Sequence, residues 1–576
     1  DDVTARPRYA EWRGADAYIS LHTNAGGGDG TSSYIHNTAP SAGSARLQAA
    51  VHTQVVGDIR SGYDSTWTDR GQLTANFGEV RLLSTMPGVL LELAFHDVAN
   101  SRDHRALHDP RFRYISGRAY ARGVLRYFSN APFPPEAPTA LRVTQHAGRG
   151  LRVAWEAVSG ATYYSIEQSP DWVGFVEIAQ TSGTAWDTPA LPHGSVLSFR
   201  VRAGNASGRS FPTETLTAGT SHRKRADVLL VQGFDRLDRY VKGPENTGNY
   251  LRRHAAAIRS AAQFSLGFDA ASNEAVLLGR VRMGDYVAVD WACGEESTAD
   301  ETFSSAEQSL VTSYLQAGGR LLVSGAEVGW DLSAKGSAAD RAFFENRIGA
   351  TYVADDANTY GFRAAAGSHL FTGIPAGAFD NGSSGTYDVD YADVITPTDP
   401  KSQLCLVYSD GRGAAIQRID GNSRVVFLGF PLECITDDAL RAEIMVRALR
   451  FLLTPRPLEA DPEVLLGNTL TLDVAQPNDA GQTYVLAAAL RLGSIPLPVD
   501  HLVPLAADPV LELSLIPNPV FLAFRGTLDA AGRGQGRFAV PNLPVARGVD
   551  VYFSGMTADN TGAFRSVLPW VRTTIR

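Results

Sequence analysis

The stretch Ala17-Tyr18-Ile19-Ser20-Leu21-His22-Thr23-Asn24-Ala25 combines a short apolar strand with a histidine that directly follows it. A second apolar stretch, Val89-Leu90-Leu91-Glu92-Leu93, places a carboxylate at a second strand end. Residues 44–61 and 114–128 have the apolar spacing of amphipathic helices. Strands that alternate with helices indicate an α/β domain, whose sites form at strand ends. We therefore predict an α/β domain over residues 1–130 with His22 and Glu92 as its candidate site.

The chemistry of these two side chains is compatible with hydrolysis. An imidazole is a common zinc ligand, and burial raises the pKa of a carboxyl group such as Glu92, which suits it to proton transfer near neutral pH. The residues alone do not distinguish a zinc ligand from a structural histidine, because a histidine beside a strand is often an ordinary hydrogen-bonded side chain.

The order of motifs adds a resemblance to a known family. The segment that ends in Ser20-Leu21-His22-Thr23-Asn24-Ala25 is similar to the S-[IL]-H-x-N-A motif of the zinc-dependent N-acetylmuramoyl-L-alanine amidases of the amidase-3 family. Gly30-Thr31-Ser32-Ser33-Tyr34 resembles the strand that comes next in that family. Glu92-Leu93-Ala94-Phe95, followed by Asn100 and Asp103, resembles the family's E-x-x-F segment. The likeness covers about 128 residues and keeps the motifs in order.

By this resemblance, His22 is a zinc ligand and Glu92 is the catalytic carboxylate, and Asn24 and Asn100 are candidate substrate-binding residues. The expected cofactor is one zinc ion, and the expected reaction cuts the amide between N-acetylmuramic acid and L-alanine in peptidoglycan. The family's other two zinc ligands are expected upstream of Asp1, so one recognisable ligand stands in the chain. His36, His96, His104 and His108 match no ligand position and are expected to be surface or supporting side chains.

The missing ligands keep a second interpretation open. The chain is either an envelope peptidoglycan hydrolase whose N-terminal part exists elsewhere, or a non-catalytic structural or scaffolding protein that uses an amidase fold for binding. A subunit of a larger envelope assembly is a third hypothesis. The expected location is the bacterial cell envelope, periplasmic or extracellular, with peptidoglycan as partner and envelope proteins as possible partners of the accessory β domains.

Three further regions follow a proline-rich joint at residues 131–138. Residues 134–219 alternate apolar and polar positions and resemble a fibronectin type III module, with Trp155 at the position of that family's core tryptophan and Leu197 in place of its usual tyrosine. Residues 458–576 are rich in strands and turn residues, which predicts a terminal β-sandwich.

Residues 225–454 return to an α/β pattern and predict a flavodoxin-like, doubly wound domain. The region resembles the glutamine-amidotransferase-like domains, in which a nucleophilic cysteine stands on a sharp turn after a strand. Ala326 stands where that cysteine is expected, so we predict a non-catalytic binding or spacer module. Cys293 follows another strand, and a structural or disulfide-bonded role is favoured over a reactive one.

Composition limits the remaining classes. The 576 residues carry 52 Lys and Arg against 61 Asp and Glu, a net charge of -9, which gives no electrostatic reason to expect nucleic acid or an anionic membrane as partner. No apolar run approaches the roughly 20 residues of a transmembrane helix. The most apolar tract, 495–524, is interrupted by prolines and predicts strands joined by turns. Three cysteines allow at most one disulfide, and the chain opens without a signal peptide, so one was removed or the chain is a fragment.

Overall fold

The computed structural model describes residues 2–129, 131–146, 150–169, 174–220, 226–236, 250–260, 266–299, 301–453, 457–461, 463–476, 479–498 and 501–576. The chain divides into two compact units. Unit 1 comprises Asp1–Pro135 and Gly204–Arg209, and unit 2 comprises Glu136–Ala203 and Ser210–Arg576. Residues 221–225 and 454–456, which lie at the boundaries of the predicted regions, are outside the described residues.

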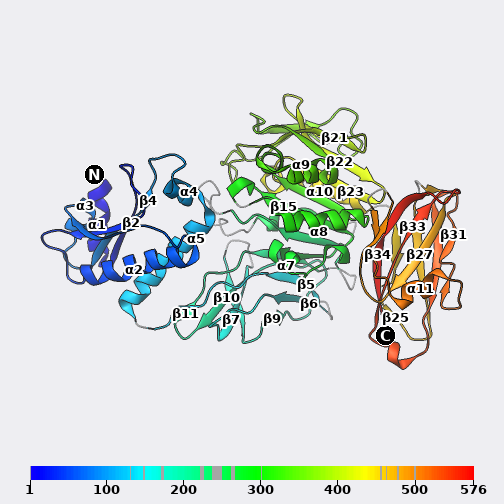
Figure 1. Cartoon of the computed structure of the whole chain (residues 1–576), viewed down its shortest axis with the longest axis horizontal. Helices are drawn as coiled ribbons and strands as arrows, with labels where there is room; N and C mark the ends of the chain where they lie inside the picture. Colours follow the sequence, from blue (N-terminus) through cyan, green and yellow to red (C-terminus); the bar gives the residue numbers. More distant parts are fainter. Residues whose placement is uncertain are drawn as a thin grey trace. The chain divides into compact units, whose positions relative to one another are not determined.

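Unit 1 is built on a four-stranded mixed sheet in the order β1-β4-β2-β3. Its strands are β1 (Tyr18–Asn24), β2 (Thr31–His36), β3 (Asp69–Ala75) and β4 (Gly88–Phe95), and its helices are α1 (Asp2–Arg13), α2 (Ser44–Gly62), α3 (Gly78–Arg81), α4 (Arg102–His108) and α5 (Pro110–Phe128). The long helices α2 and α5 pack against each other along the sheet (Figure 1). Their apolar sides and the alternate residues Val89 and Leu91 of β4 form the core of the unit.

Helix α5 begins at Pro110, four residues before the predicted start at 114. Asp109 explains the earlier start, because its side chain accepts a hydrogen bond from the main-chain N–H of Arg111, and the next residue is a proline in the first turn. A side-chain cap followed by proline is a common way to begin a helix.

The buried carboxylate of Asp103 holds together the loops that flank the strand ends. One of its oxygens accepts hydrogen bonds from the N–H groups of Gly30, at 2.7 Å, and Phe95, at 3.0 Å. The start of β2 and the end of β4 are therefore fixed relative to helix α4, which carries Asp103.

Unit 2 begins with the strands of the fibronectin-like region. They are β5 (Arg142–His146), β6 (Gly150–Ala154), β7 (Tyr163–Ser169), β8 (Val176–Thr181), β9 (Ala185–Asp187), β10 (Val196–Asn205) and β12 (Leu216–Gly219). The last two residues of β10 and the short strand β11 (Gly208–Arg209) belong to unit 1. Trp155 is buried and packs on Tyr164 with ring centroids 5.2 Å apart. The hydroxyl of Tyr164 accepts a hydrogen bond from the N–H of Val158, so this core tyrosine keeps its polar end satisfied.

The next region contains five parallel strands in the order β14-β13-β15-β16-β23. These are β13 (Val228–Gln232), β14 (Phe268–Ser272), β15 (Ala288–Gly294), β16 (Arg320–Gly325) and β23 (Ser423–Leu428). In chain order this is 2-1-3-4-5, an arrangement common in doubly wound sheets. Antiparallel strands extend the sheet beyond β23, namely β22 (Gly413–Asp420), β21 (Ser402–Tyr408), β18 (Gly361–Ala364) and β19 (Gly377–Ala378), while β17 (Ala350–Ala354) and β20 (Val394–Pro397) form a separate ribbon.

The helices of this region are α6 (Leu251–Ser260), α7 (Asn273–Leu277), α8 (Ser305–Gln316), α9 (Ala338–Phe343) and α10 (Asp438–Leu453). Short irregular turns of helix are η2 (Met283–Asp285), η3 (Ser297–Ala299), η4 (Trp330–Lys335), η5 (Phe344–Ile348) and η6 (Leu432–Cys434), and η8 (Pro544–Ala546) lies further on. Helix α8 shows why the sequence begins a helix there, because Ser304 and Glu307 form a reciprocal capping box.

The fibronectin-like strands and the parallel sheet share hydrogen bonds. Strand β14 pairs with β5 at Ala270 and Val143, and it also pairs with β12 at Phe268 and Gly219. One apolar cluster contains Trp155 together with residues of the parallel sheet. The two regions therefore form one continuous sheet and one core.

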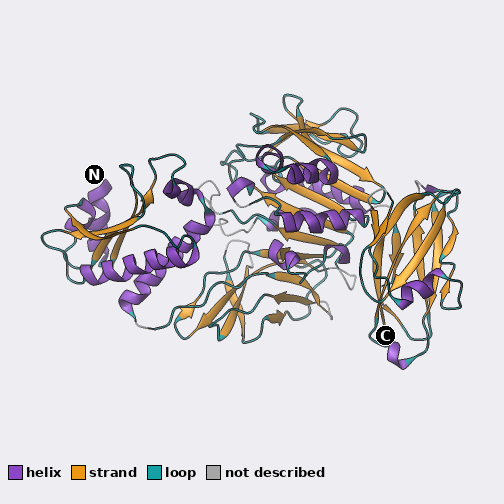
Figure 2. Ribbon diagram, viewed as in Figure 1, coloured by secondary structure: helices purple, strands orange, loops and turns teal. Residues whose placement is uncertain are grey.

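The C-terminal region packs two sheets of mainly antiparallel strands (Figure 2). One sheet contains β24 (Leu458–Ala460), β26 (Thr469–Ala475), β32 (Arg533–Ala539) and β30 (Phe521–Leu522). The other contains β25 (Glu463–Val464), β34 (Phe564–Ile575), β33 (Asp550–Ala558), β27 (Thr483–Ala489) and β31 (Arg525–Thr527), and β28 (Ile495–Leu497) pairs with β29 (His501–Val503). Side chains from both sheets form a single core.

The expectation of strands and turns alone over 495–524 is wrong in part. Pro509–Leu515 is a helix, α11, whose first turn accepts the proline and is capped by Asp508 through the N–H groups of Val510 and Leu511. The proline that suggested a break therefore stands at the start of a helix, where its missing N–H costs nothing.

No helix in the described ranges has the length and apolar character needed to cross a membrane. Cys293, Cys405 and Cys434 are all buried free thiols.

Candidate active site

Strands β1 and β4 place the two predicted site residues side by side. They run parallel, and His22 is the register partner of Glu92. Directly opposed residues of neighbouring strands project from the same face of a sheet, so the imidazole and the carboxylate lie on one face. The sequence analysis predicted both residues at strand ends. In the structure, β1 pairs with β4 as far as Asn24, so both residues lie within their strands.

A third group, Glu79 of α3, approaches His22. Its Oε1 atom lies 3.5 Å from His22 Nε2, and its side chain is 8% exposed against 26% for His22. The hydroxyl of Ser20, two residues before His22 on the same face, lies 2.8 Å from the same ring nitrogen. The sequence analysis missed Glu79, because a single glutamate in a four-residue helix has no motif or periodicity that marks it.

The carboxyl group of Glu92 is shaped by its surroundings. Burial, with a smaller contribution from the negative charge of Glu79, raises its pKa to about 7. Its Oε2 atom is buried and has no hydrogen-bond partner in the described part of the chain. A carboxyl group poised near neutral pH exchanges protons readily, as a general base must.

The two asparagines have contacts within their own loops. The Asn24 side chain accepts a hydrogen bond from the N–H of Ala25 at 2.8 Å. Asn100 is exposed and has a left-handed backbone, with φ of 61°, and its carbonyl accepts from the Arg105 guanidinium. The structure brings His22 and Glu92 together, and a role of Asn24 or Asn100 in binding stays a prediction.

The other histidines of unit 1 also have local contacts. The Nδ1 atom of His36 lies 3.1 Å from the carbonyl of Ala39, and the rings of His104 and His108 stack 4.7 Å apart. His96 is exposed.

The α/β region of unit 2 was expected to carry Ala326 at the position of a nucleophile. The structure gives the left-handed backbone of that turn to Glu327, with φ of 58°, and buries Ala326 completely. The Oε2 atom of Glu327 lies 3.4 Å from the Arg236 guanidinium. The turn thus carries a carboxylate, and it has no thiol. Cys293 is fully buried, and burial raises its thiol pKa well above the usual value, which opposes nucleophilic chemistry.

The same region holds a buried charged network around His254. Its Nδ1 lies 2.8 Å from Asp290, its Nε2 lies 3.0 Å from Glu433, and the hydroxyl of Tyr387 donates to Glu433 at 2.7 Å. All four side chains are inaccessible to solvent or nearly so. Because no ligand can reach it without unfolding, the network is structural.

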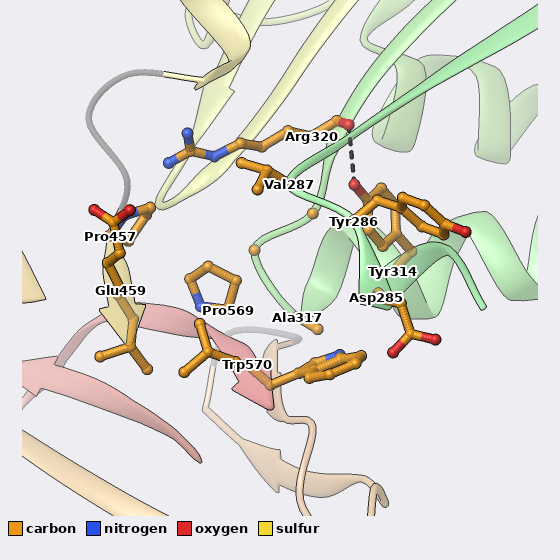
Figure 3. A pocket seen from close by; sticks show the side chains of 15 residues that line it. Asp285, Tyr286, Val287, Tyr314, Ala317, Arg320, Pro457, Glu459, Pro569 and Trp570 are labelled. Carbon is orange, nitrogen blue, oxygen red and sulfur yellow. Dashed lines mark hydrogen bonds between the residues drawn. The ribbon is translucent and has the colours of Figure 1, made fainter. Parts of the chain in front are cut away.

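A small cavity of about 60 Å³ lies between the parallel sheet and the C-terminal sandwich (Figure 3). Tyr286, Tyr314 and Trp570 contribute aromatic walls, and the hydroxyl of Tyr314 donates to the carbonyl of Arg320 at 3.0 Å. Its described lining contains no histidine or cysteine, and its volume suits a few water molecules. The described lining residues all belong to unit 2, whereas His22 and Glu92 belong to unit 1.

Comparison with known proteins identifies the fold that carries His22 and Glu92. Residues 1–126 match the family model Amidase_3, described as N-acetylmuramoyl-L-alanine amidase. These residues form an Amidase_3 domain. The match includes β1, β4 and α3, so His22, Glu79 and Glu92 all lie inside the Amidase_3 domain.

Two curated relatives share the Amidase_3 domain. A sporulation-specific N-acetylmuramoyl-L-alanine amidase of Bacillus subtilis (strain 168) is 34% identical over 118 residues, which is 20% of this chain and 42% of the relative. The N-acetylmuramoyl-L-alanine amidase CwlM of Bacillus licheniformis is 33% identical over 129 residues, or 22% of this chain and 46% of the relative. The chain thus spans less than half the length of these relatives.

Solved structures are similar to separate parts of the chain. An N-acetylmuramoyl-L-alanine amidase from Clostridium difficile 630 is 24% identical, with 23% of this chain and 67% of that chain covered and a TM-score of 0.20. The structure of FN3tt is 26% identical and covers 15% of this chain and 91% of its own, with a TM-score of 0.13.

The candidate site contains side chains of the types that bind zinc. Zinc sites use histidine nitrogen and carboxylate oxygen, and catalytic zinc is normally held by three protein ligands. His22 supplies an imidazole on the same face as two carboxylates. Among the described residues no group of three His, Cys, Asp or Glu side chains is arranged to hold a metal ion. His22 therefore fits as one ligand of a set that these residues do not complete.

Proposed function

We propose that the chain is a peptidoglycan hydrolase that cleaves the amide between N-acetylmuramic acid and L-alanine. The observation that carries this proposal is the pairing of His22 with Glu92 on one sheet face, inside the residues that match the Amidase_3 model. The raised pKa of Glu92 supports a role in proton transfer.

In this proposal His22 holds zinc, together with ligands that the described residues do not supply. Zinc, when bound, polarises a water molecule and the scissile carbonyl. Glu92 accepts the proton of the attacking water and delivers it to the leaving amine nitrogen of L-alanine. Its buried Oε2 atom has no hydrogen-bond partner among the described residues, and burial raises the pKa of the carboxyl group to about 7, so the group can hold a proton near neutral pH.

We infer supporting roles for the other regions. The fibronectin-like strands and the C-terminal sandwich would position the Amidase_3 domain or bind envelope proteins, and the flavodoxin-like, glutamine-amidotransferase-like region would act as a non-catalytic module. The turn with Glu327 and the buried Cys293 support the last assignment. A peptidoglycan substrate would place the protein in the bacterial envelope.

The test uses the full chain with purified peptidoglycan and zinc. Mass spectrometry of the products should show free L-alanine amino termini on the released peptides. Glu92→Gln should abolish this release, because a neutral amide cannot take the proton. Glu11→Gln is the matched control, since the Glu11 carboxylate bonds to Ser84 and Thr85 and to neither His22 nor Glu92 among the described residues.

The zinc content of the natively isolated protein is measured on the same sample. Release that depends on Glu92 with about one zinc per chain supports the hydrolase. Peptidoglycan binding without zinc and without release would overturn it and favour the non-catalytic scaffold.

A further inference from the structure

Unit 2 contains a second pocket, of about 340 Å³, beside the small cavity of Figure 3. One wall comes from residues 276–284 and helix α8, and the other comes from Trp570 and the residues around the β28–β29 hairpin. Tyr314 and Trp570 line both spaces. A concave site of this volume is within the range of pockets that bind small molecules.

Direct contacts join the two walls. The side-chain amide of Asn422 donates to the carbonyl of Val567 and accepts from the side-chain amide of Gln476, and both amide side chains are buried. A Cβ atom on Gly284 would lie 2.4 Å from Trp570 Nε1, so the indole packs on a backbone that only glycine leaves open. The pocket is therefore enclosed by elements that contact each other.

The walls of the pocket are mainly hydrocarbon. Leu310 is 36% exposed although it belongs to the lining, so the apolar surface of the wall continues to the solvent. The hydroxyl of Ser313 donates to the carbonyl of Ser309, one turn earlier in α8, and so has a partner within the helix. An aliphatic ligand would be matched by the lining side chains Val276, Val281, Met283, Leu310, Leu492 and Leu502.

The described lining contains one charged residue, Arg282. Its side chain is 48% exposed, which places it at the mouth, and its Nε atom lies 3.5 Å from the carboxylate of Asp285, which is not part of this lining. A guanidinium pairs well with a carboxylate group. The charge at the mouth thus favours a ligand with an anionic end.

We propose that this pocket binds a single-chain carboxylate amphiphile, a free fatty acid of medium length, with its chain between α8 and Trp570 and its carboxylate at Arg282. The volume accommodates about ten non-hydrogen atoms at the roughly 30 Å³ that a water molecule occupies in the liquid. The expected ligand therefore has a chain of about eight to ten carbon atoms. This binding is independent of peptidoglycan hydrolysis.

The first test is calorimetric titration of the full chain with hexanoate, octanoate, decanoate and dodecanoate, each below its micelle concentration. Burial of each methylene group should tighten binding about fourfold, and the gain should stop once the pocket is full, near ten carbons. One saturable site with this plateau supports the proposal. No binding, many weak sites, or an affinity that still rises fourfold per methylene from decanoate to dodecanoate would overturn it.

The second test blocks the pocket from the exposed side of α8. A helical side chain covers the turn before its own residue, so the indole of Ser313→Trp should lie over Leu310 and fill the mouth. Octanoate binding should weaken by more than about tenfold, the equivalent of two methylene groups. Ser309→Trp is the matched control, since Ser309 is also exposed and bonds to the carbonyl four residues earlier but does not line the pocket. Equal affinities in the two variants would refute the site.

The third test concerns the carboxylate and needs no change in the pocket wall. Arg282→Gln should weaken octanoate binding about 2- to 5-fold, as expected for a partly exposed ion pair, and should leave 1-octanol binding unchanged. An equal loss for both ligands would contradict the assigned orientation. Phosphatidylglycerol vesicles that bind the chain equally well in Ser313→Trp, without any binding of octanoate, would show a membrane-docking surface and overturn the fatty-acid site.

Discussion

Replacing His254 by alanine should destabilise the parallel sheet of unit 2 by several kcal/mol. His254 lies between the carboxylates of Asp290 and Glu433, and these two charges raise its pKa to about 10 in spite of its burial. The ring is therefore positively charged at pH 7. His254→Ala would leave two buried carboxylates without their cation.

The magnitude follows from the pKa. A rise from 6.5 to about 10 corresponds to about 5 kcal/mol of preference for the folded state, at 1.36 kcal/mol per pKa unit. Removing one partner of a buried ion pair typically costs about 3–5 kcal/mol, a magnitude similar to the one derived from the pKa. Since the folded pKa is the higher one, this stabilisation is complete below pH 6.5 and is lost as the pH rises toward 10.

Hydrogen exchange measured by mass spectrometry is the suitable assay, because a chain with several regions does not unfold in one step. Peptides from α6 and β15 should lose about 3–5 kcal/mol of protection in His254→Ala, and wild-type protection there should fall between pH 6.5 and 10. His369→Ala, which removes an exposed histidine of the same unit, should change neither. A loss below about 1 kcal/mol, or protection that is constant with pH, would refute the charged network.

Three further outcomes follow from the same contacts. Because the folded pKa of Glu92 is raised to about 7, the metal-free Amidase_3 domain should lose stability as the pH rises from 4.5 through 7, and Glu92→Gln should remove that dependence in thermal unfolding at several pH values. Asp103→Asn should cost about 1–3 kcal/mol and speed amide exchange at Gly30 and Phe95, since a buried acceptor of both N–H groups is weakened. The three buried thiols should react with a maleimide only after denaturation, and rapid labelling of the native chain would contradict their burial.

The sequence was informative where a motif or a period repeats. Helix α2 covers 44–62 where apolar spacing predicted 44–61, and Trp155 is buried as its position in the fibronectin-like pattern predicted. His22 and Glu92 could be paired in advance because each stands in an apolar strand of a recognisable family segment.

Other features depend on distance in space, which no local pattern encodes. Glu79 joins the site through the packing of α3 on α1, and the sequence around it is unremarkable in composition. Asp508 caps helix α11, although the prolines around it predicted strands and turns. The proline content alone therefore predicted the wrong secondary structure at this segment. The pairing of β14 with β5 links residues more than a hundred positions apart, so a segment-by-segment analysis treats them as independent.

The pairing of β14 with β5 matters for the design of shortened forms of the protein. Strand β14 lies at the margin of the parallel sheet, and its outer backbone groups are covered by β5 and β12. A shortened protein that begins after residue 219 would lack β5 and β12. The outer N–H and C=O groups of β14 would then be unpaired, which favours strand pairing between molecules. The fibronectin-like strands therefore act as a built-in guard against aggregation of their neighbour, and the two regions should be inherited, expressed and transplanted as a pair.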